Sequence, residues 1–293
     1  MKLPSHRSRI VIAGVTLAVT LGFTPVLHAQ YGGSGGQQQQ PPPSLQPQPA
    51  KPGAQQEQKP ATPAPVDPEE EKAYKALTDV KPDAFDQQIQ AGEQYLQKYP
   101  TGRYAEQVYA RLAIAYAEKQ QFDKMYAASD KALSMNANDI TVLVRVGWVI
   151  PHNYDPNDPE SDRRLAKAEA YEKHAIELLT NMTKPEGITD EQFNKAKAAS
   201  LAQAHSGLGL VYFRQQQFDK SVDEMQQAVK LDTSPDSVDL YVLGISLNQL
   251  KRYSEAAAAF QKCASTPGAV QDRCKQREGE AKKLASAQPA PPK

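Results

Sequence analysis

The sequence has few of the residues around which enzyme and metal sites are usually built. Among its 293 residues are two cysteines, five histidines and one tryptophan, and aromatic residues make up only 7% of the chain. It contains no phosphate-binding P-loop motif and no paired-histidine zinc motif. The histidines beyond the N-terminal region, His152, His174 and His205, are far apart in the sequence. We therefore expect no catalytic residues, no cofactor and no metal site.

The chain also lacks an excess of charge of either sign, with 34 basic and 34 acidic residues. Lys2, Arg7 and Arg9 lie in an N-terminal segment without acidic residues, so the remainder carries 31 basic residues against 34 acidic ones. A weakly acidic chain does not provide the basic surface on which nonspecific nucleic-acid binding depends. We expect no nucleic-acid partner.

Long hydrophobic runs are absent except near the N-terminus. There the three basic residues precede an apolar run at 10–23, and small residues follow as far as Ala29. This order is typical of a secretory signal peptide and predicts cleavage between Ala29 and Gln30. An uncleaved membrane anchor at 10–27 is the alternative, although its length is marginal and Pro25 interrupts it. We expect an exported protein, periplasmic or secreted, that contacts a membrane only if this segment stays uncleaved.

Residues 30–68 have almost nothing apolar to bury, because they include ten prolines, ten glutamines and five glycines. Such a composition cannot form a packed core, so it predicts a disordered tether. The proline-rich C-terminal end predicts a second disordered segment.

Residues 204–232 show the clearest structural pattern. In the first half the small Gly209 lies between large residues, and in the second half the large Met225 lies between the small Ser221 and Ala228. Small residues that face large ones let two antiparallel helices approach closely. The pattern predicts a helix, a short turn and a second helix.

The same order of sizes recurs along the chain. Gly244 lies 35 residues after Gly209, and Gly147 lies 34 residues after Ala113. This recurrence resembles the tetratricopeptide repeat, a helix-turn-helix unit of about 34 residues. The resemblance implies an all-α helical solenoid of antiparallel helix pairs. The stretch at 93–113 also resembles a repeat junction of periplasmic envelope proteins.

These observations divide the chain into segments. We expect a signal peptide at 1–29, a disordered Gln/Pro/Gly-rich linker at 30–67, a repeat array at 68–285 and a disordered tail at 286–293. Within the array we expect units near 68–104, 105–139, 140–182, 183–235 and 236–268, and a capping helix at 269–285.

Two units depart from the regular period. The segment Pro151–Pro159 replaces a tight turn and inserts about nine residues relative to the repeat. Its alternating acidic residues are similar to a calcium loop but lack the glycine of that motif, so we expect no metal there. Further on, Thr189 and Gln192 form a predicted capping box that starts a helix reaching about Gln216. This helix should project beyond the array or pack along the Pro151 loop.

In this family the first helices of the pairs line an inner wall, so the resemblance implies that binding occurs there. The inward positions that we assign to a partner-binding groove are Ile114, Val144, Trp148, Leu210, Phe213, Tyr241 and Ile245. Because they are apolar, they favour an extended or helical apolar peptide as ligand. Two alternatives remain: the long helix fills the groove permanently, and Trp148 staples the Pro151 loop rather than anchoring a partner.

The two cysteines lie near the end of the array. Cys263 takes a small position of the last unit, and Cys274 lies on the helix that follows. In an exported chain they are expected to form a disulfide, and the alternative is two reduced, buried thiols.

The function that these features favour is a non-catalytic protein-protein interaction adaptor or scaffold of the bacterial cell envelope, whose partner is another protein or peptide. The alternative is a periplasmic chaperone or envelope assembly factor that holds clients transiently. A discrete, saturable partner would favour the first, and many weak apolar clients would favour the second.

Overall fold

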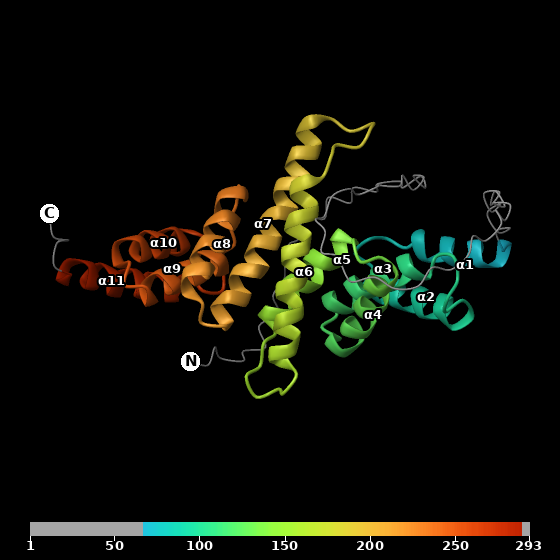
Figure 1. Cartoon of the computed structure of the whole chain (residues 1–293), viewed down its shortest axis with the longest axis horizontal. Helices are drawn as coiled ribbons and strands as arrows, with labels where there is room; N and C mark the ends of the chain where they lie inside the picture. Colours follow the sequence, from blue (N-terminus) through green and yellow to red (C-terminus); the bar gives the residue numbers. More distant parts are fainter. Residues whose placement is uncertain (1–66, 289–293) are drawn as a thin grey trace, which may run out of the picture. The chain divides into compact units, whose positions relative to one another are not determined.

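The computed structural model describes residues 67–288, so the predictions for the signal peptide with its Ala29/Gln30 cleavage site, for the linker to residue 66 and for the tail beyond residue 288 lie outside it. The described residues fold into helices and contain no strand, which confirms the predicted all-α solenoid class (Figure 1). The helices are α1 Pro68–Thr78, α2 Phe85–Lys98, α3 Ala105–Glu118, α4 Phe122–Met135, α5 Ile140–His152, α6 Ser161–Asn181, α7 Asp190–Arg214, α8 Phe218–Leu231, α9 Ser237–Gln249, α10 Tyr253–Ser265 and α11 Gln271–Ala287. None of these helices is long and apolar enough to cross a membrane.

Three helix pairs, α3/α4, α7/α8 and α9/α10, are joined by the same turn. Gln120, Gln216 and Lys251 occupy its left-handed position, with φ of 56°, 61° and 59°. The amide of the next residue donates to a carbonyl five residues back in each case, for example from Gln217 to Tyr212 at 2.9 Å. This Schellman arrangement satisfies the carbonyl groups that the first helix leaves unpaired. The repetition of one turn geometry is structural evidence of a repeated unit.

The first helices of successive pairs form one continuous layer. α3 packs against α5, α5 against α7, and α7 against α9, while each also packs against the second helix of its own pair. α1 and α2 precede this layer, and α11 packs on α10 at the other end. We call the surface formed by α3, α5, α7 and α9 the first-helix face.

The predicted pairing of small with large residues is present. The space beside Gly209 and Gly244 is filled mainly by a side chain of the partner helix rather than by its backbone. A Cβ atom on Gly209 would lie 2.9 Å from Cγ of Met225, and one on Gly244 would lie 2.5 Å from Cε1 of Phe260. Met225 and Phe260 are both fully buried. The helices of each pair can therefore pack closely, because a large side chain on one lies directly over a glycine on the other.

The connection between α5 and α6 differs from the predicted one. Pro151 does not end the helix but lies inside it, buried, and α5 continues to His152. Pro151 lacks the amide that would donate to the carbonyl four residues back, but the next turn still closes, because the amide of Asn153 donates to the carbonyl of Val149 at 3.3 Å. The inserted loop is therefore shorter than predicted and begins at Asn153.

α6 and α7 are longer than the other helices of the repeated pairs, with 21 and 25 residues. The capping box that starts α7 is present: Thr189 Oγ1 accepts from the amide of Gln192, and Gln192 Oε1 accepts from the amide of Thr189. The N-terminal part of α7 runs beside the C-terminal part of α6 (Figure 1), and Lys197 Nζ donates to the carbonyl of Thr180 at 2.9 Å. The N-terminal part of α7 thus forms a hairpin with α6, whereas its C-terminal end contacts the Pro151 loop through Arg214, so each predicted placement describes one end of the helix.

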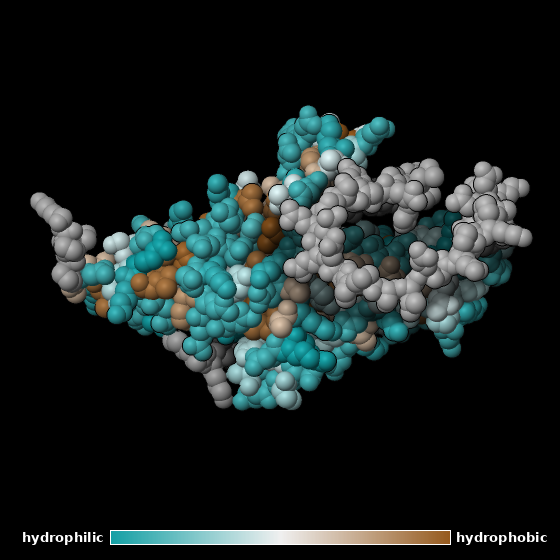
Figure 2. All heavy atoms as spheres, viewed as in Figure 1, coloured by the Kyte–Doolittle hydropathy of each residue, from teal (hydrophilic) through white to brown (hydrophobic). Residues whose placement is uncertain are grey.

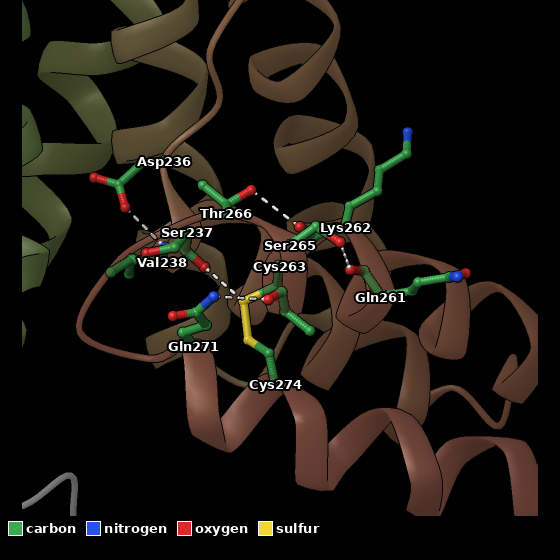
Figure 3. Close-up of a disulfide and its surroundings, with 11 residues drawn as sticks. Asp236, Ser237, Val238, Gln261, Lys262, Cys263, Ser265, Thr266, Gln271 and Cys274 are labelled. Carbon is green, nitrogen blue, oxygen red and sulfur yellow. Dashed lines mark hydrogen bonds between the residues drawn. A yellow bond between two sulfur atoms is a disulfide. The ribbon is translucent and has the colours of Figure 1, made fainter.

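The last pair is closed by α11. The Sγ atoms of Cys263 on α10 and Cys274 on α11 are joined in a disulfide, with the two Cα atoms 5.7 Å apart (Figure 3). Both cysteines are fully buried beside Leu240 and Val270. Gln271 Nε2 donates to the carbonyl of Ala264 at 3.0 Å and ties the start of α11 to the end of α10.

Candidate functional site

The first-helix face carries most of the residues that the sequence assigned to a groove. Ile114, Trp148, Phe213, Tyr241 and Ile245 are half-buried, so part of each side chain is open to contact. Phe213, Tyr241 and Ile245 each pack against the same core cluster. Large apolar side chains that are fixed by the core but partly exposed are typical anchors for a partner.

Two of the predicted groove residues are placed differently. Val144 and Leu210 are 5% and 4% exposed, so both are core residues. Val144 packs with Ala175 and Leu179 of α6, and Leu210 with Met225 of α8. The inward assignment failed for them because a first helix buries more than one of its faces when it packs both on its own partner helix and on its neighbours.

A chain of hydrogen bonds links three helices at the centre of this face. The indole Nε1–H of Trp148 on α5 donates to Ser206 Oγ on α7 at 3.2 Å. The hydroxyl of Ser206 donates in turn to Asp239 Oδ1 on α9 at 2.7 Å. The three helices are thus held in register by polar contacts at the point where the predicted apolar groove lies. The groove prediction missed this polar character.

Trp148 is enclosed by charged and aromatic neighbours as well. The His152 ring centroid lies 3.9 Å from that of Trp148, and the guanidinium of Arg145 lies 5.4 Å from the indole ring. Arg145 also pairs with Glu118 at the end of α3. A cation beside the indole face is attracted to the ring and limits its movement. The indole is therefore held on its polar edge and on its face.

Burial shifts the pKa values of Asp239 and His152 in opposite directions. It raises the pKa of Asp239 to about 7, because removal from water disfavours the carboxylate more than the Ser206 hydrogen bond favours it. It lowers the pKa of His152 to about 4, because the imidazolium is the charged form. At neutral pH His152 is uncharged, whereas Asp239 is close to half-ionised.

The Pro151 loop is tied to the same region. Arg214 Nε, at the end of α7, donates to the carbonyl of Pro151 at 3.1 Å, and its guanidinium lies 5.6 Å from the ring of Tyr154. Trp148 and Tyr154 both pack against the same core cluster, and the ring of Trp148 lies beside that of His152, the last residue before the loop. Trp148 is thus next to the loop, as the stapling alternative requires, and it is also partly exposed.

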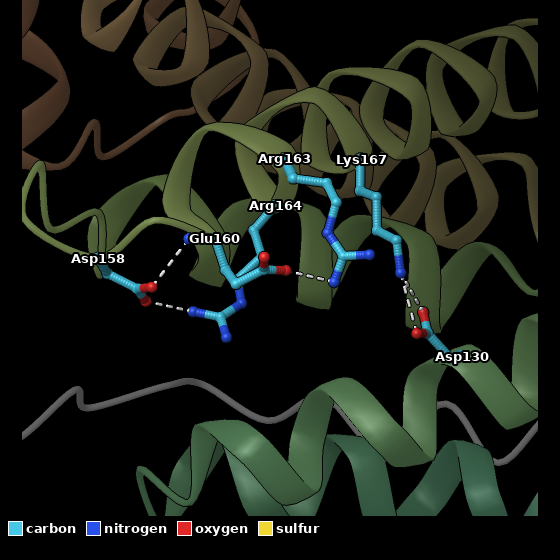
Figure 4. A network of polar contacts seen from close by, with 6 residues as sticks. All are labelled: Asp130, Asp158, Glu160, Arg163, Arg164 and Lys167. Carbon is cyan, nitrogen blue, oxygen red and sulfur yellow. Dashed lines mark hydrogen bonds and ion pairs between the residues drawn. The ribbon is translucent and has the colours of Figure 1, made fainter.

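The acidic residues of the loop are used locally. Asp155 Oδ1 accepts from the amide of Asn157, and Asp158 accepts from the amide of Glu160 and from Arg164 at 2.5 Å. Figure 4 shows the contacts of Asp158 together with two further ion pairs, between Arg163 and Glu160 and between Lys167 and Asp130. No group of three or more candidate ligands for a metal ion occurs between residues 67 and 288. The charged residues of the loop thus form ion pairs with α6, and α6 forms an ion pair with α4.

A hollow of about 480 Å³, lined by apolar and by charged residues, lies between α8 and α10, with Leu240, Leu243 and Leu247 of α9 as its floor. Hydrophobic residues also gather over the region of α7 to α10 in Figure 2. The three leucines are only 2%, 7% and 2% exposed, so the floor offers little surface to a ligand. The first-helix face is the stronger candidate for a partner.

The long helix α7 forms part of the first-helix face, but it does not lie across that face and cover it. The contacts of its N-terminal half are with α6: Leu201 packs in a cluster with Ile176 and Leu179, and Lys197 also lies 3.4 Å from the carbonyl of Met182. Only the C-terminal half of α7 contributes to the face, through Ser206 and Phe213.

Comparison with known proteins identifies two of the helix pairs. A family model described as "Tetratricopeptide repeat" matches residues 202–234, and a second model with the same description matches residues 106–139. These ranges contain the C-terminal part of α7 with α8, and α3 with α4. No curated protein matches the chain.

Several solved structures are similar to it. One is described as a MamA RS-1 double mutant, with 16% identity, coverage of 74% of this chain and 94% of its own, and a TM-score of 0.46. Another is TTC0263, a thermophilic tetratricopeptide repeat protein of Thermus thermophilus, with 15% identity, coverage of 73% and 99%, and a TM-score of 0.45. A third is MamA from residue 41 to its end, from Desulfovibrio magneticus RS-1, with 14% identity, coverage of 75% and 94%, and a TM-score of 0.44.

Proposed function

We propose that this tetratricopeptide repeat protein is a non-catalytic adaptor or scaffold that binds a partner protein through its first-helix face. The repeat matches support the general role, because repeats of this kind present stacked helices as a surface for protein contacts. The proposal adds the face and the residues: Trp148, Phe213 and Tyr241 are the aromatic anchors. Ile114 and Ile245 extend the contact toward either end.

The observation that carries the proposal is the exposure of aromatic side chains from three neighbouring first helices. Trp148 on α5, Phe213 on α7 and Tyr241 on α9 are each half-buried, and each is fixed by packing or by a hydrogen bond. Rigid aromatic residues lose little conformational entropy when a partner covers them, so they contribute strongly to binding. The polar chain through Ser206 and Asp239 links the three helices that carry these side chains.

The cell envelope is the proposed location. Its support is the sequence of residues 1–29, where a basic segment, an apolar run and small residues follow in the order of an export signal. The composition of residues 30–68 supports a tether between that segment and the repeats. Determining the N-terminal residue of the mature protein tests this, because a chain that begins at Gln30 would show export and cleavage, and one that keeps residues 1–29 would show an anchor.

The experiment that tests the binding face is site-specific photo-crosslinking in the native cell. A photo-reactive residue replaces Phe213 in one strain and Tyr241 in a second, and Gln227, an exposed residue on α8, serves as the matched control. We expect one discrete crosslinked product from Phe213 and Tyr241 and none from Gln227. Glu224 is less suitable as the control because it binds His205 Nδ1 at 2.6 Å.

Other outcomes separate the alternatives. A broad distribution of products from Phe213 and Tyr241 would favour a chaperone that holds many clients. Products from Gln227 alone would move the binding surface to the second helices and contradict the proposal. If no position gives a product, the first-helix face does not bind a partner in the cell, and the adaptor role through it is wrong.

A further inference from the structure

Glu172 stands at a position that is apolar in two other repeats. Met225 follows Gly209 by 16 residues, and Phe260 follows Gly244 by the same interval. Glu172 follows Gly147 by 25 residues, and the difference of nine is the predicted size of the Pro151 insertion. All three side chains are at most 1% exposed. A carboxyl group thus occupies the place of a methionine or a phenylalanine in the core.

Two glycines make room for this carboxyl group. A Cβ atom on Gly147 of α5 would lie 2.7 Å from Oε1 of Glu172, and one on Gly207 of α7 would overlap the same oxygen. Val242, 35 residues after Gly207, fills the matching place on α9 and lies in the core cluster of Met225. The space around Glu172 is therefore particular to the α5–α6–α7 junction.

The two glycines are also the chain neighbours of the site residues. Gly147 precedes Trp148, and Gly207 follows Ser206, so Glu172 lies directly behind the Trp148–Ser206 hydrogen bond. A Cβ atom on Gly207 would come within 3.1 Å of the Cα atom of Trp148. The side chain of Glu172 is consequently wedged against the two backbone segments that carry the bond.

Neither carboxyl oxygen of Glu172 has a hydrogen-bond partner among the described residues. Burial raises the pKa of Glu172 well above its usual value, and no neighbouring charge contributes to that shift. The titratable groups of the three helices near this point are engaged elsewhere: Arg145 with Glu118, His152 with the carbonyl of Trp148, His205 with Glu224, Lys173 with Glu169, and Arg214 with the carbonyl of Pro151.

We propose that Glu172 is a positioning residue of the first-helix face, which in its neutral form sets the spacing of α5 and α7 and which on losing its proton loosens the Trp148–Ser206 contact. An ionised carboxylate without a partner is costly in the core, so the helices must separate until water reaches it. The partner face would then be ordered at lower pH and looser at higher pH. An effect of this change on partner binding rests on the proposed function, whereas the weakening of the Trp148–Ser206 contact does not depend on it.

The test uses the purified full chain without any partner, so its result is independent of whether the face binds one. Trp148 is the only tryptophan, and its fluorescence therefore reports on this junction alone. We would follow emission and acrylamide quenching from pH 5 to 9, together with urea unfolding, in wild type, Glu172→Met and Glu172→Gln. Methionine reproduces the residue of the next unit, and glutamine keeps the shape of the neutral acid.

Wild type should show a rise in quenching with a midpoint well above pH 4.5, and its unfolding constant should increase by up to tenfold per pH unit through the same window. The rise in quenching should be absent in Glu172→Met and Glu172→Gln, and their unfolding constant should keep only the pH dependence that other groups, such as Asp239, contribute. Asp239→Asn is the control, because Asp239 reaches Trp148 through Ser206 and titrates near pH 7. The Glu172-dependent change should persist in that variant.

Three results would overturn the inference. The first is a wild type with flat fluorescence and quenching over the whole range. The second is a change of the same size and midpoint in the Glu172 variants, and the third is its loss in Asp239→Asn. If neither Glu172 variant folds, the carboxyl group makes an essential polar contact, which also contradicts a neutral, unpartnered wedge.

Discussion

The indole nitrogen of Trp148 lies 3.2 Å from the hydroxyl oxygen of Ser206, a residue 58 positions further along the chain. This contact connects α5 to α7 across the whole Pro151 loop and the α6–α7 hairpin, and Ser206 passes it on to Asp239 of α9. Ser206 is 3% exposed, so water cannot easily replace it. One small hydroxyl group therefore bridges the three helices.

Replacing Ser206 by alanine should destabilise the protein by about 1–3 kcal/mol, because the indole donor and the Asp239 acceptor both lose the buried hydroxyl group that joins them. Urea unfolding would measure the loss, and the emission of Trp148 should shift in the folded state. Ser254→Ala on the exposed side of α10 is the control and should change neither quantity. A Ser206→Ala protein as stable as wild type would show that the contact is not a structural bridge.

The glycines provide a second prediction through a matched pair of substitutions. Gly244→Ala places a methyl group 2.5 Å from the ring of Phe260, whereas Gly279→Ala, in the middle of α11, meets nothing within 4 Å. The first should lower the free energy of unfolding by about 1–3 kcal/mol through overpacking. The second should raise it by about 0.4–1 kcal/mol, because alanine loses less backbone entropy than glycine in a helix. Equal effects of the two changes would contradict the proposed small-to-large packing.

The sequence was sufficient for the helix pairs because the order of sizes encodes packing directly. Gly209 with Met225, and Gly244 with Phe260, are local pairs within one unit, and their period is visible without a structure. The turns were harder, since glutamine and lysine occupy left-handed positions where glycine is the usual residue. Their conformation follows from the packing of the helices they join.

The site was only partly predictable for a related reason. Trp148, Phe213 and Tyr241 could be assigned to the face from the repeat register, whereas nothing in the sequence marks Asp239 and only an indirect signal marks Glu172. Their titration depends on burial by helices that are distant along the chain. One clue did exist for Glu172: once the inserted residues are removed, it aligns with two large apolar residues of other units.

The disulfide should stabilise the C-terminal end of the array. It links residues separated by 11 positions and fixes α11 on α10. By the chain-entropy estimate, a loop of this size contributes about 3 kcal/mol. Reduction should therefore lower the urea midpoint and make α11 exchange its amide hydrogens faster, while α3 and α4 stay protected. The double variant Cys263→Ala/Cys274→Ala should be insensitive to reductant, and an intact mass unchanged by reduction would show that the bridge is absent.

Asp239 should make stability depend on pH in a direction opposite to that of an ordinary salt-bridged acid. Its folded pKa of about 7 exceeds the unfolded value of about 4, so the folded state binds more protons between these limits. Stability is therefore highest at or below pH 4 as far as this group is concerned, and falls as the pH rises toward 7. Above that value the contribution of Asp239 is constant.

Asp239→Asn removes this titration and keeps an acceptor for the hydroxyl of Ser206. In wild type, the ionisation of Asp239 should lower the free energy of unfolding by roughly 1–2 kcal/mol between pH 4 and 7, and this fall should be absent in the variant. The value is smaller than the full pKa shift would give, because the side chain is partly exposed. Urea unfolding at intervals of one pH unit would measure it, and Asp272→Asn, which removes an exposed carboxylate of α11, is the charge-matched control. Adding Glu172→Gln to Asp239→Asn should remove the further loss of stability that the ionisation of Glu172 causes as the pH rises, so the slope of the double variant should be smaller than that of Asp239→Asn alone. If the slope of Asp239→Asn equals that of wild type, Asp239 is ionised well below pH 7 and the polar centre of the first-helix face carries a full negative charge.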